Sequence, residues 1–301
     1  MPMKLNVIVP ARNEGQNIPF FYERARVALE SIPSLEWSIV FVNNSSEDDS
    51  LDRMFKLHAA DPRVKIITLA RNFGYPAALV AGLSAVDGDY YAIVDVDCED
   101  PPELLVDFYK AILDGAQLAY GERSNRDEPW LVTFGRKLFY LANKGVADSE
   151  IVMWMGEFSM MTRQVRDALL VPKTAFMSVR AEMGYVGFRR EAIPYLRAKR
   201  TYGQTHYNFL RMTLYAIASI LSGTTFPLRF VSYLAVFVGL AFPAYMLVAG
   251  LSKADIAAAA AIVALYYLVI TIPLVAIYLA RVYKNVVRRP LFVIDQTRTS
   301  L

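Results

Sequence analysis

Residues 90–103 read YYAIVDVDCEDPPE: an apolar, aromatic run reaches two aspartates spaced i, i+2, and two prolines follow. The run 90–94 predicts a buried strand, and the prolines predict that a helix begins directly after the acidic residues. Asp95, Asp97 and Glu99 are therefore expected at the tip of a strand. Carboxylate oxygens suit Mg²⁺ or Mn²⁺, and a metal there would neutralise charge that develops on a leaving diphosphate. Taken alone, the motif is equally consistent with an acidic surface loop.

Strands and helices alternate around this motif. Apolar runs predict strands at 5–9, 38–42, 64–69, 90–94 and 116–121, and helical patterns between and after them predict helices at 18–31, 50–59, 75–86 and 102–114. Asp100 is the expected N-cap of the last helix. The rhythm predicts an α/β fold, with a parallel sheet and helices on both faces. Ligands bind such sheets at the carboxyl ends of the strands, where polar clusters also follow the first three strands.

Two long stretches near the end of the chain, 230–251 and 256–280, are apolar and contain no charged residue. At 1.5 Å per residue the shorter stretch reaches about 33 Å, enough for a hydrocarbon core of roughly 30 Å. Uncharged runs of this length are rare in soluble cores, so a transmembrane hairpin with a tight turn at 252–255 is predicted. The basic residues that flank it predict a cell-membrane protein with its catalytic domain and both termini in the cytoplasm. These residues are Arg229, Arg281, Lys284, Arg288 and Arg289.

Charge and cysteine content limit the partners and the cellular compartment that fit this chain. The formal net charge of the 301-residue chain is only +3, which argues against nucleic acid as a partner. The single cysteine, Cys98, excludes an internal disulfide framework and fits a reducing compartment.

Leucine and isoleucine side chains within 207–222 recur on one helical face, which predicts an interfacial amphipathic helix or, alternatively, one packed on the domain.

These patterns divide the chain into four regions. A cytosolic domain is expected at 1–205, an interfacial helical region at 206–227, the transmembrane hairpin at 228–280, and a basic cytosolic tail with a terminal strand at 281–301. The strand-like part of the tail, 291–294, is expected to pair either with a sheet edge of its own chain or with that of a neighbouring subunit. A homo-oligomer is therefore one possible assembly.

Several short motifs occur in a fixed order along the chain. They are RNFG at 71–74, DVD at 95–97, DPPE at 100–103, YGER at 120–123, VGFR at 186–189, RTYGQTHY at 200–207 and RPLFVI at 289–294. With this set the sequence resembles the polyprenyl-phosphate glycosyltransferases of glycosyltransferase family 2, which include dolichol-phosphate mannose synthases and undecaprenyl-phosphate glucosyltransferases. The resemblance covers essentially the whole chain.

The resemblance implies a nucleotide-diphospho-sugar transferase fold of the GT-A type, with a mixed sheet flanked by helices and a C-terminal two-helix transmembrane hairpin. It implies four groups of site residues. Those for catalysis are Asp95, Asp97, Glu157 and Arg200. Those for the nucleotide-sugar are Pro10, Ala11, Asn13, Glu14, Asn43, Arg71, Gly74, Asp95 and Arg200. Those for the lipid phosphate are Arg123, Arg126 and Arg136. Those for Mg²⁺ or Mn²⁺ are Asp95, Asp97 and Glu99.

The implied reaction is the inverting transfer of a sugar, with a hexose favoured, from a nucleotide-sugar to polyprenyl phosphate. A UDP-hexose is the favoured donor and GDP-mannose is possible. The attacking phosphate has a second pKa of about 6, by analogy with phosphorylated side chains, so it needs no strong base. Glu157 is expected to orient the acceptor or the sugar hydroxyls.

The chain departs from the family pattern around the substrates. Asn43 and Asn44 replace two aspartates, Glu157 and Ser159 replace an aspartate and an arginine, and His206 replaces a lysine. A carboxylate acceptor thus becomes an amide that can also donate. These changes do not alter the predicted reaction type. They do mean that the motifs no longer identify the sugar.

Two other functions are compatible with parts of the sequence. A processive polysaccharide synthase shares the nucleotide-binding domain, but it carries a Gln-x-x-Arg-Trp motif and more spans than one hairpin. A non-catalytic membrane scaffold derived from the enzyme would explain Asn43, Asn44 and Ser159. Against the scaffold, Asp95, Asp97, Glu99 and Arg200 are retained together.

Overall fold

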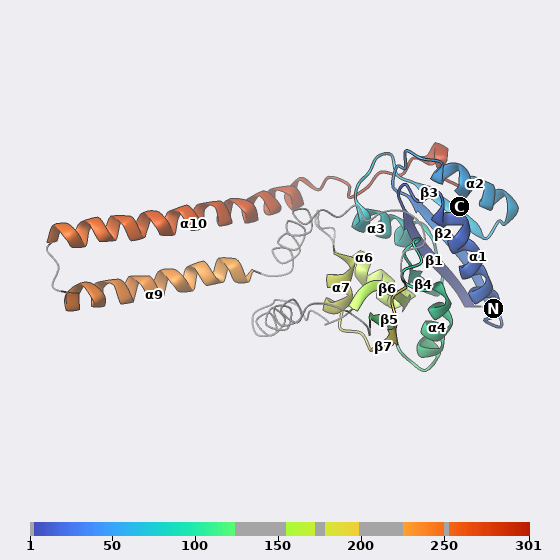
Figure 1. Ribbon diagram of the computed structural model, residues 1–301, viewed down its shortest axis with the longest axis horizontal. Helices are drawn as coiled ribbons and strands as arrows, with labels where there is room; N and C mark the ends of the chain where they lie inside the picture. Colours follow the sequence, from blue (N-terminus) through green and yellow to red (C-terminus); the bar gives the residue numbers. More distant parts are fainter. Residues whose placement is uncertain (1–2, 124–154, 172–177, 199–224, 250–252) are drawn as a thin grey trace.

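The computed structural model describes residues 3–123, 155–171, 178–198, 225–249 and 253–301. Two parts are visible in Figure 1: an α/β body and a pair of long helices that projects from it. The body contains the expected alternation of strands and helices, and the pair of helices corresponds to the two uncharged stretches.

In the described part of the chain, the sheet has seven strands in the order β3-β2-β1-β4-β6-β5-β7. They are β1 (Met3–Ala11), β2 (Leu35–Asn43), β3 (Val64–Thr68), β4 (Tyr90–Ile93), β5 (Leu118–Arg123), β6 (Met155–Thr162) and β7 (Arg190–Tyr195). The first four strands are parallel, whereas β6 runs antiparallel to both β4 and β5. The all-parallel sheet predicted from the strand–helix rhythm is therefore wrong, and the mixed sheet implied by the family resemblance is confirmed.

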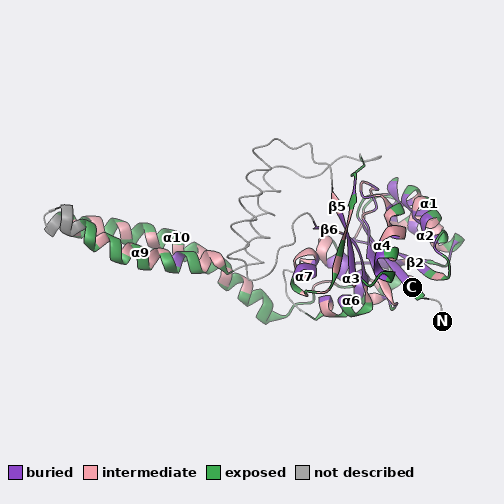
Figure 2. Ribbon diagram, turned by 90° about the horizontal axis from the view of Figure 1, so that it is seen from below, coloured by how far each residue is buried: buried purple, intermediate pink, exposed green. Residues whose placement is uncertain are grey.

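Each face of the sheet carries its own hydrophobic core, because side chains alternate along each strand. In β1, Val7 and Val9 point into one core and Ile8 into the other. The first core is covered by α1 (Asn17–Glu30), α2 (Ser50–Ala60) and α4 (Leu105–Leu113). The second is covered by α3 (Tyr75–Ala85), α6 (Arg163–Leu170) and α7 (Val179–Tyr185). Figure 2 shows the buried sheet between these layers.

The helix predicted at 102–114 is divided into a 3₁₀ turn, η1 (Pro102–Leu104), and α4. Its predicted N-cap is wrong: Pro101 is the residue at this position, and no side chain caps the turn. The carboxylate of Asp100 instead accepts hydrogen bonds from Arg123 and Tyr195. A buried ion pair thus replaces a local cap.

Helix α3 packs close to the sheet because it contains Gly82. A Cβ atom at this position would lie 2.4 Å from Cγ2 of Ile8 and 3.0 Å from Cγ2 of Val42. A side chain there would push the helix away from β1 and β2, since the core has no spare volume. The close packing matters for the site, because the first residue of α3 reaches the end of β4.

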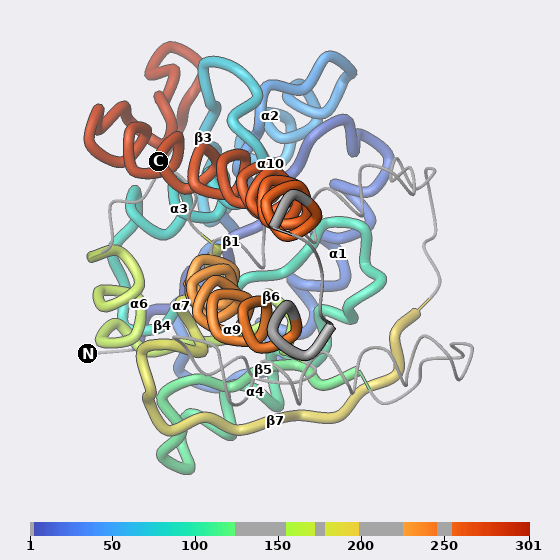
Figure 3. Tube along the Cα trace, turned by 90° about the vertical axis from the view of Figure 1, so that its left-hand side faces the viewer, coloured from blue at the N-terminus to red at the C-terminus, as the bar shows by residue number. Residues whose placement is uncertain are grey.

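The two apolar stretches form α9 (Phe226–Ala249) and α10 (Lys253–Val287), which lie side by side in Figures 1 and 3. Both are long and apolar enough to cross a membrane, and almost none of either span is buried in the protein: 6% for the first and none for the second. A pair of core helices is therefore excluded for these stretches. Lys253 to Asp255, expected in the turn, already belong to α10, and this helix continues beyond residue 280 to Val287.

The C-terminal tail returns from α10 to the edge of the sheet. Ile294 bridges to Leu69, and Ser300 bridges to Ile66 with a hydrogen bond of 2.8 Å from its backbone N–H to the Ile66 carbonyl. The hydroxyl of Ser300 also lies 2.7 Å from Nε2 of His58 on α2. The tail forms isolated bridges rather than the predicted terminal strand. Of the two predicted partners, the structure shows the edge of the chain's own sheet, at β3 and Leu69.

We expect removal of residues 291–301 to lower the melting temperature of the purified protein by about 4–8 °C. The deletion uncovers the β3 edge and the half-buried Leu291, Phe292 and Ile294, which together contribute roughly 2 kcal/mol. Thermal unfolding in detergent, followed by intrinsic fluorescence, measures this shift. Removing only the exposed Leu301 is the control, and equal melting temperatures for both deletions would contradict the prediction.

Candidate active site

A cluster of carboxylates lies at the carboxyl end of β4. Burial raises the pKa of Asp95 to about 7, and a hydrogen bond from Tyr75 opposes that rise. The hydroxyl of Tyr75 donates to Oδ1 of Asp95 over 2.8 Å. Negative charges around Asp95 raise its pKa further, and they belong to Asp97, Asp100 and Glu157. The site thus holds an excess of negative charge that a cation or a hydrogen-bond donor would stabilise.

Glu157 reaches this cluster through the antiparallel pairing of β6 with β4. Ile93 pairs with Ser159, and extending the register past this pair brings Glu157 opposite Asp95. Sequence analysis predicted Asp95 and Glu157 as site residues, but it predicted no strand at the position of β6. The structure therefore brings Asp95, Asp97 and Glu157 to one edge of the sheet, as expected for side chains that act on the same ligand.

The loop after β4 turns sharply at Cys98, which is buried and has a φ of 57°. Within this turn the backbone N–H of Glu99 donates to Oδ1 of Asp97 over 3.1 Å. The turn uses one oxygen of the Asp97 carboxylate. Its other oxygen makes no hydrogen bond to the described residues.

Asp100 anchors the far end of this loop and is only 2% exposed. It accepts hydrogen bonds from Tyr195 and from Nη2 of Arg123, the latter over 3.1 Å. Nε of Arg123 also donates to the Tyr195 hydroxyl over 3.1 Å. Burial lowers the pKa of Arg123, but the Asp100 charge and the Tyr195 hydrogen bond outweigh it and raise this pKa. Arg123, predicted as a lipid-phosphate ligand, is placed here in an internal ion pair.

Glu99 is directed into a second ion pair, with Arg197. Nε of Arg197 also lies 3.6 Å from Oδ1 of Asp100.

Among the described residues no three His, Cys, Asp or Glu side chains are spaced to hold a metal ion. This donor set still fits Mg²⁺ or Mn²⁺, because Mg²⁺ in such sites takes one or two carboxylates and completes its shell with substrate phosphates and water. Glu99 as a further metal ligand stays a prediction.

Several residues predicted to bind the nucleotide-sugar lie at the end of β1 and in the loop that follows it. Pro10 and Ala11 are buried at the end of β1. The next loop is tied to the loop after β2, because Asn13 accepts a hydrogen bond of 2.8 Å from the Glu47 backbone and its own N–H donates to Ser46 over 3.1 Å. These contacts hold the two loops side by side above the sheet.

The two asparagines that replace aspartates are both buried, with Asn43 1% and Asn44 5% exposed. Oδ1 of Asn43 accepts from the Ser46 backbone over 2.9 Å, and Oδ1 of Asn44 accepts from the Phe73 backbone over 3.0 Å. The Asn43 oxygen thus stabilises the turn after β2, whereas the Asn44 oxygen connects this loop to the loop after β3; a carboxylate oxygen could accept the same hydrogen bonds. Nδ2 of Asn43 finds no partner in the described part of the chain.

The loop after β3 carries the RNFG motif. Arg71 is exposed, and its guanidinium lies 4.1 Å above the Phe73 ring. Gly74 adopts a φ of 92°, which favours glycine, and this turn starts α3. Arg126, Arg136, Arg200 and His206, together with most of the predicted interfacial helix, lie outside the described residues.

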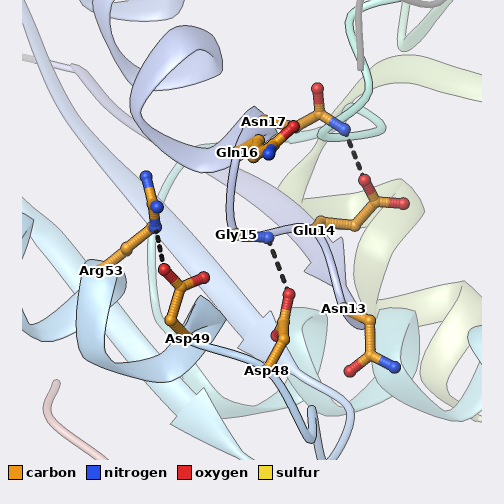
Figure 4. A pocket seen from close by; sticks show the side chains of 8 residues that line it. All are labelled: Asn13, Glu14, Gly15, Gln16, Asn17, Asp48, Asp49 and Arg53. Atoms are coloured by element: carbon orange, nitrogen blue, oxygen red, sulfur yellow. Dashed lines mark hydrogen bonds and ion pairs between the residues drawn. The ribbon is translucent and has the colours of Figure 1, made fainter. Parts of the chain in front are cut away.

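A polar cavity of about 250 Å³ lies at the N-terminal ends of α1 and α2 (Figure 4). Its lining residues are Asn13, Glu14, Gly15, Gln16, Asn17, Asp48, Asp49 and Arg53. Asp48 accepts the Gly15 N–H over 3.2 Å and Asp49 pairs with Arg53 over 2.7 Å. The cavity includes two residues predicted for the nucleotide, Asn13 and Glu14, but neither Asp95 nor Asp97.

Sequence analysis missed Tyr75 and Tyr195, and it identified Arg197 only as a basic residue near the membrane, not as the ion-pair partner of Glu99. Tyr75 directly follows the RNFG motif, a position that could have marked it. Tyr195 and Arg197 belong to a segment, at and after β7, for which no strand was predicted. All three act on the loop after β4 from distant parts of the sequence.

Comparisons with known proteins agree with this geometry. The sequence model of the family Glycosyl transferase family 2 matches residues 6–178. A prophage bactoprenol glucosyl transferase homolog of Escherichia coli (strain K12) is 31% identical, over 78% of this chain and 77% of that protein. A bactoprenol glucosyl transferase derived from prophage SfII of Shigella flexneri is 29% identical, over 98% of both. The structure of mannosyl-3-phosphoglycerate synthase from Rubrobacter xylanophilus matches with a TM-score of 0.50 at 15% identity, over 73% of each chain, which shows a shared fold.

Proposed function

The chain belongs to glycosyl transferase family 2, and on this basis we propose that it transfers a sugar from a nucleotide-sugar to a polyprenyl phosphate at the cytoplasmic face of a membrane. One observation carries the proposal: Asp95, Asp97 and Glu157 meet at the end of β4 in a chain whose α9 and α10 expose two membrane-length apolar surfaces. The relatives named bactoprenol glucosyl transferases support a lipid acceptor and a glucosyl donor.

The proposed reaction is a single displacement at the anomeric carbon. A phosphate oxygen of the lipid forms the new C–O bond while the bond to the diphosphate breaks, so the nucleoside diphosphate leaves and the anomeric configuration inverts. The lipid phosphate, with a second pKa of about 6, is largely ionised at neutral pH. The site therefore has to position the reactants and stabilise charge rather than remove a proton.

The residues of the cluster have distinct proposed tasks. Asp97 faces the diphosphate end of the donor, Asp95 lies near the ribose or the metal, and Glu157 orients hydroxyl groups of the sugar or the acceptor. A bound Mg²⁺ or Mn²⁺, held by Asp97 and by the diphosphate, would offset the charge of the leaving group. Arg200 for the diphosphate, and Arg126 and Arg136 for the lipid phosphate, complete the proposal.

The membrane part of the proposal follows from where the acceptor resides. A polyprenyl phosphate keeps its charged group at the bilayer surface, so the cluster must lie close to that surface. Arg229 in the first turn of α9 and the basic residues in the last turns of α10 favour the cytoplasm for both ends of the hairpin. The catalytic domain, which is continuous with both ends, would then also be cytoplasmic.

The test is an assay of the purified full-length protein in vesicles that contain polyprenyl phosphate and Mg²⁺. UDP-glucose, other UDP-hexoses and GDP-mannose are supplied separately, and the lipid product is weighed by mass spectrometry. We expect the addition of one hexose from one donor, with release of its nucleoside diphosphate. Addition of many sugars would indicate a polysaccharide synthase instead. No product and no nucleotide binding in calorimetry would indicate a scaffold.

A further inference from the structure

Tyr75 occupies a defined position between the sheet and the carboxylate cluster. It is the first residue of α3, whose close approach to β1 and β2 depends on Gly82. Its ring packs partly buried against the core that α3 shares with the sheet, and its hydroxyl lies 2.8 Å from Oδ1 of Asp95. The side chain is therefore held at its base by the core and at its tip by the carboxylate.

The hydrogen bond constrains Asp95 more than it constrains Tyr75. In the part of the chain that the structure describes, Tyr75 supplies the hydrogen-bond donor to the Asp95 side chain. The surrounding charges of Asp97, Asp100 and Glu157 repel the Asp95 carboxylate and offer it no donor while ionised.

One oxygen of Asp95 is thereby fixed, and the direction of the other follows from it. Oδ1 accepts from Tyr75, whereas Oδ2 makes no hydrogen bond within the described residues. A carboxylate oxygen of this kind, at the ligand-binding edge of the sheet, accepts a hydrogen bond from a hydroxyl group of a ligand. The phenol oxygen of Tyr75 can accept a second one, since a hydroxyl both donates and accepts.

We propose that Tyr75 is a positioning residue for the nucleotide-sugar: it holds Asp95 so that the free carboxylate oxygen receives a hydroxyl of the bound donor. The inference rests on the proposed function, because that function supplies the donor. A hydroxyl of the nucleoside is remote from the bond that breaks, so a contact with it is equally strong before and during the reaction. Loss of a contact of this type raises KM and leaves kcat unchanged.

The test compares Tyr75→Phe with Tyr90→Phe in the full-length protein. Both changes remove only a phenol hydroxyl. Tyr90 lies at the other end of β4, is partly buried against Tyr109, and has no hydrogen-bond partner for its hydroxyl in the described residues. Calorimetry with UDP or GDP, whichever the unmodified protein binds, measures affinity without the acceptor. Transfer assays with the corresponding nucleotide-sugar separate KM from kcat, and melting temperatures report folding.

For Tyr75→Phe we expect the Kd of the nucleoside diphosphate, the KM of the donor, or both to rise about tenfold, which is the usual effect of losing one hydrogen bond to a charged group. The kcat and the melting temperature should stay close to those of the unmodified protein. Tyr90→Phe should change none of these quantities. The inference is overturned if Tyr75→Phe leaves both Kd and KM unchanged, if it lowers kcat alone, or if Tyr90→Phe has the same effect.

Failure of the proposed function has a different signature. If the unmodified protein binds the nucleoside diphosphate but adds no sugar to polyprenyl phosphate, the proposed function is wrong. The Kd of the nucleotide-sugar, measured by calorimetry, then takes the place of KM in the comparison of Tyr75→Phe with Tyr90→Phe. If the unmodified protein binds neither UDP nor GDP, both proposals are overturned.

Discussion

Replacing Asp97 with alanine is expected to lower the kcat of sugar transfer by about 10³-fold, the upper range for loss of one preorganised electrostatic group. Asp97 lies in the loop after β4, two residues beyond Asp95, and one of its oxygens already accepts the Glu99 N–H within the turn. The other oxygen is the part of the carboxylate that can stabilise charge on the diphosphate, directly or through a cation. The rate of formation of the lipid-linked sugar at saturating donor, in vesicles, measures the effect.

Two variants separate the charge of Asp97 from its place in the turn. Asp97→Asn retains an oxygen that accepts the Glu99 N–H but loses the negative charge, so we expect it to be nearly as inactive as Asp97→Ala. Asp107→Ala is the matched control, because the Asp107 side chain is half-exposed on α4 and forms only a surface ion pair with Lys110. Full activity in Asp97→Ala would refute the mechanism. Full activity in Asp97→Asn would show that the turn, rather than the charge, is what transfer requires.

The first part of the fold could be predicted because its signals are local. Strands β1 to β4 are buried apolar runs that stop at polar clusters, and α1 to α3 lie between them with matching periodicity. The direction of β6 could not be predicted in this way. It depends on pairing with β4 and β5, and residues 155–162 carry no pattern that distinguishes an antiparallel strand from a parallel one. The same holds for the tail, whose partner β3 lies more than two hundred residues earlier.

The site was predictable to a similar degree. Asp95 and Asp97 were identified because acidic residues directly after a buried strand must lie at its tip. Their partners were not, since an ion pair or hydrogen bond depends on side chains that the fold brings together from distant segments. Arg123 shows the consequence: its motif predicts a ligand for lipid phosphate, whereas the structure pairs it with Asp100.

Replacing Arg123 with alanine is expected to lower the melting temperature of the protein by about 6–12 °C. Asp100 is 2% exposed, and removal of Arg123 would leave its charge buried with the Tyr195 hydroxyl and the more distant Arg197 as compensation. Breaking a buried ion pair from one side costs about 3–5 kcal/mol, and the remaining partners favour the lower end of this range. At roughly 2–4 °C per kcal/mol, this cost gives the expected shift. Thermal unfolding in detergent measures it.

A double variant then distinguishes the two roles of Arg123. Arg123→Met combined with Asp100→Asn removes both charges and keeps similar volumes, so much of the lost stability should return. If Arg123 serves only to hold Asp100, the double variant should also recover a normal KM for polyprenyl phosphate. If Arg123 also binds the lipid phosphate, stability should return while the KM for the lipid stays raised, because a neutral methionine cannot bind an anion. A single Arg123→Ala variant that melts like the unmodified protein would contradict the structural role, since a buried aspartate that has lost its guanidinium partner must lower stability.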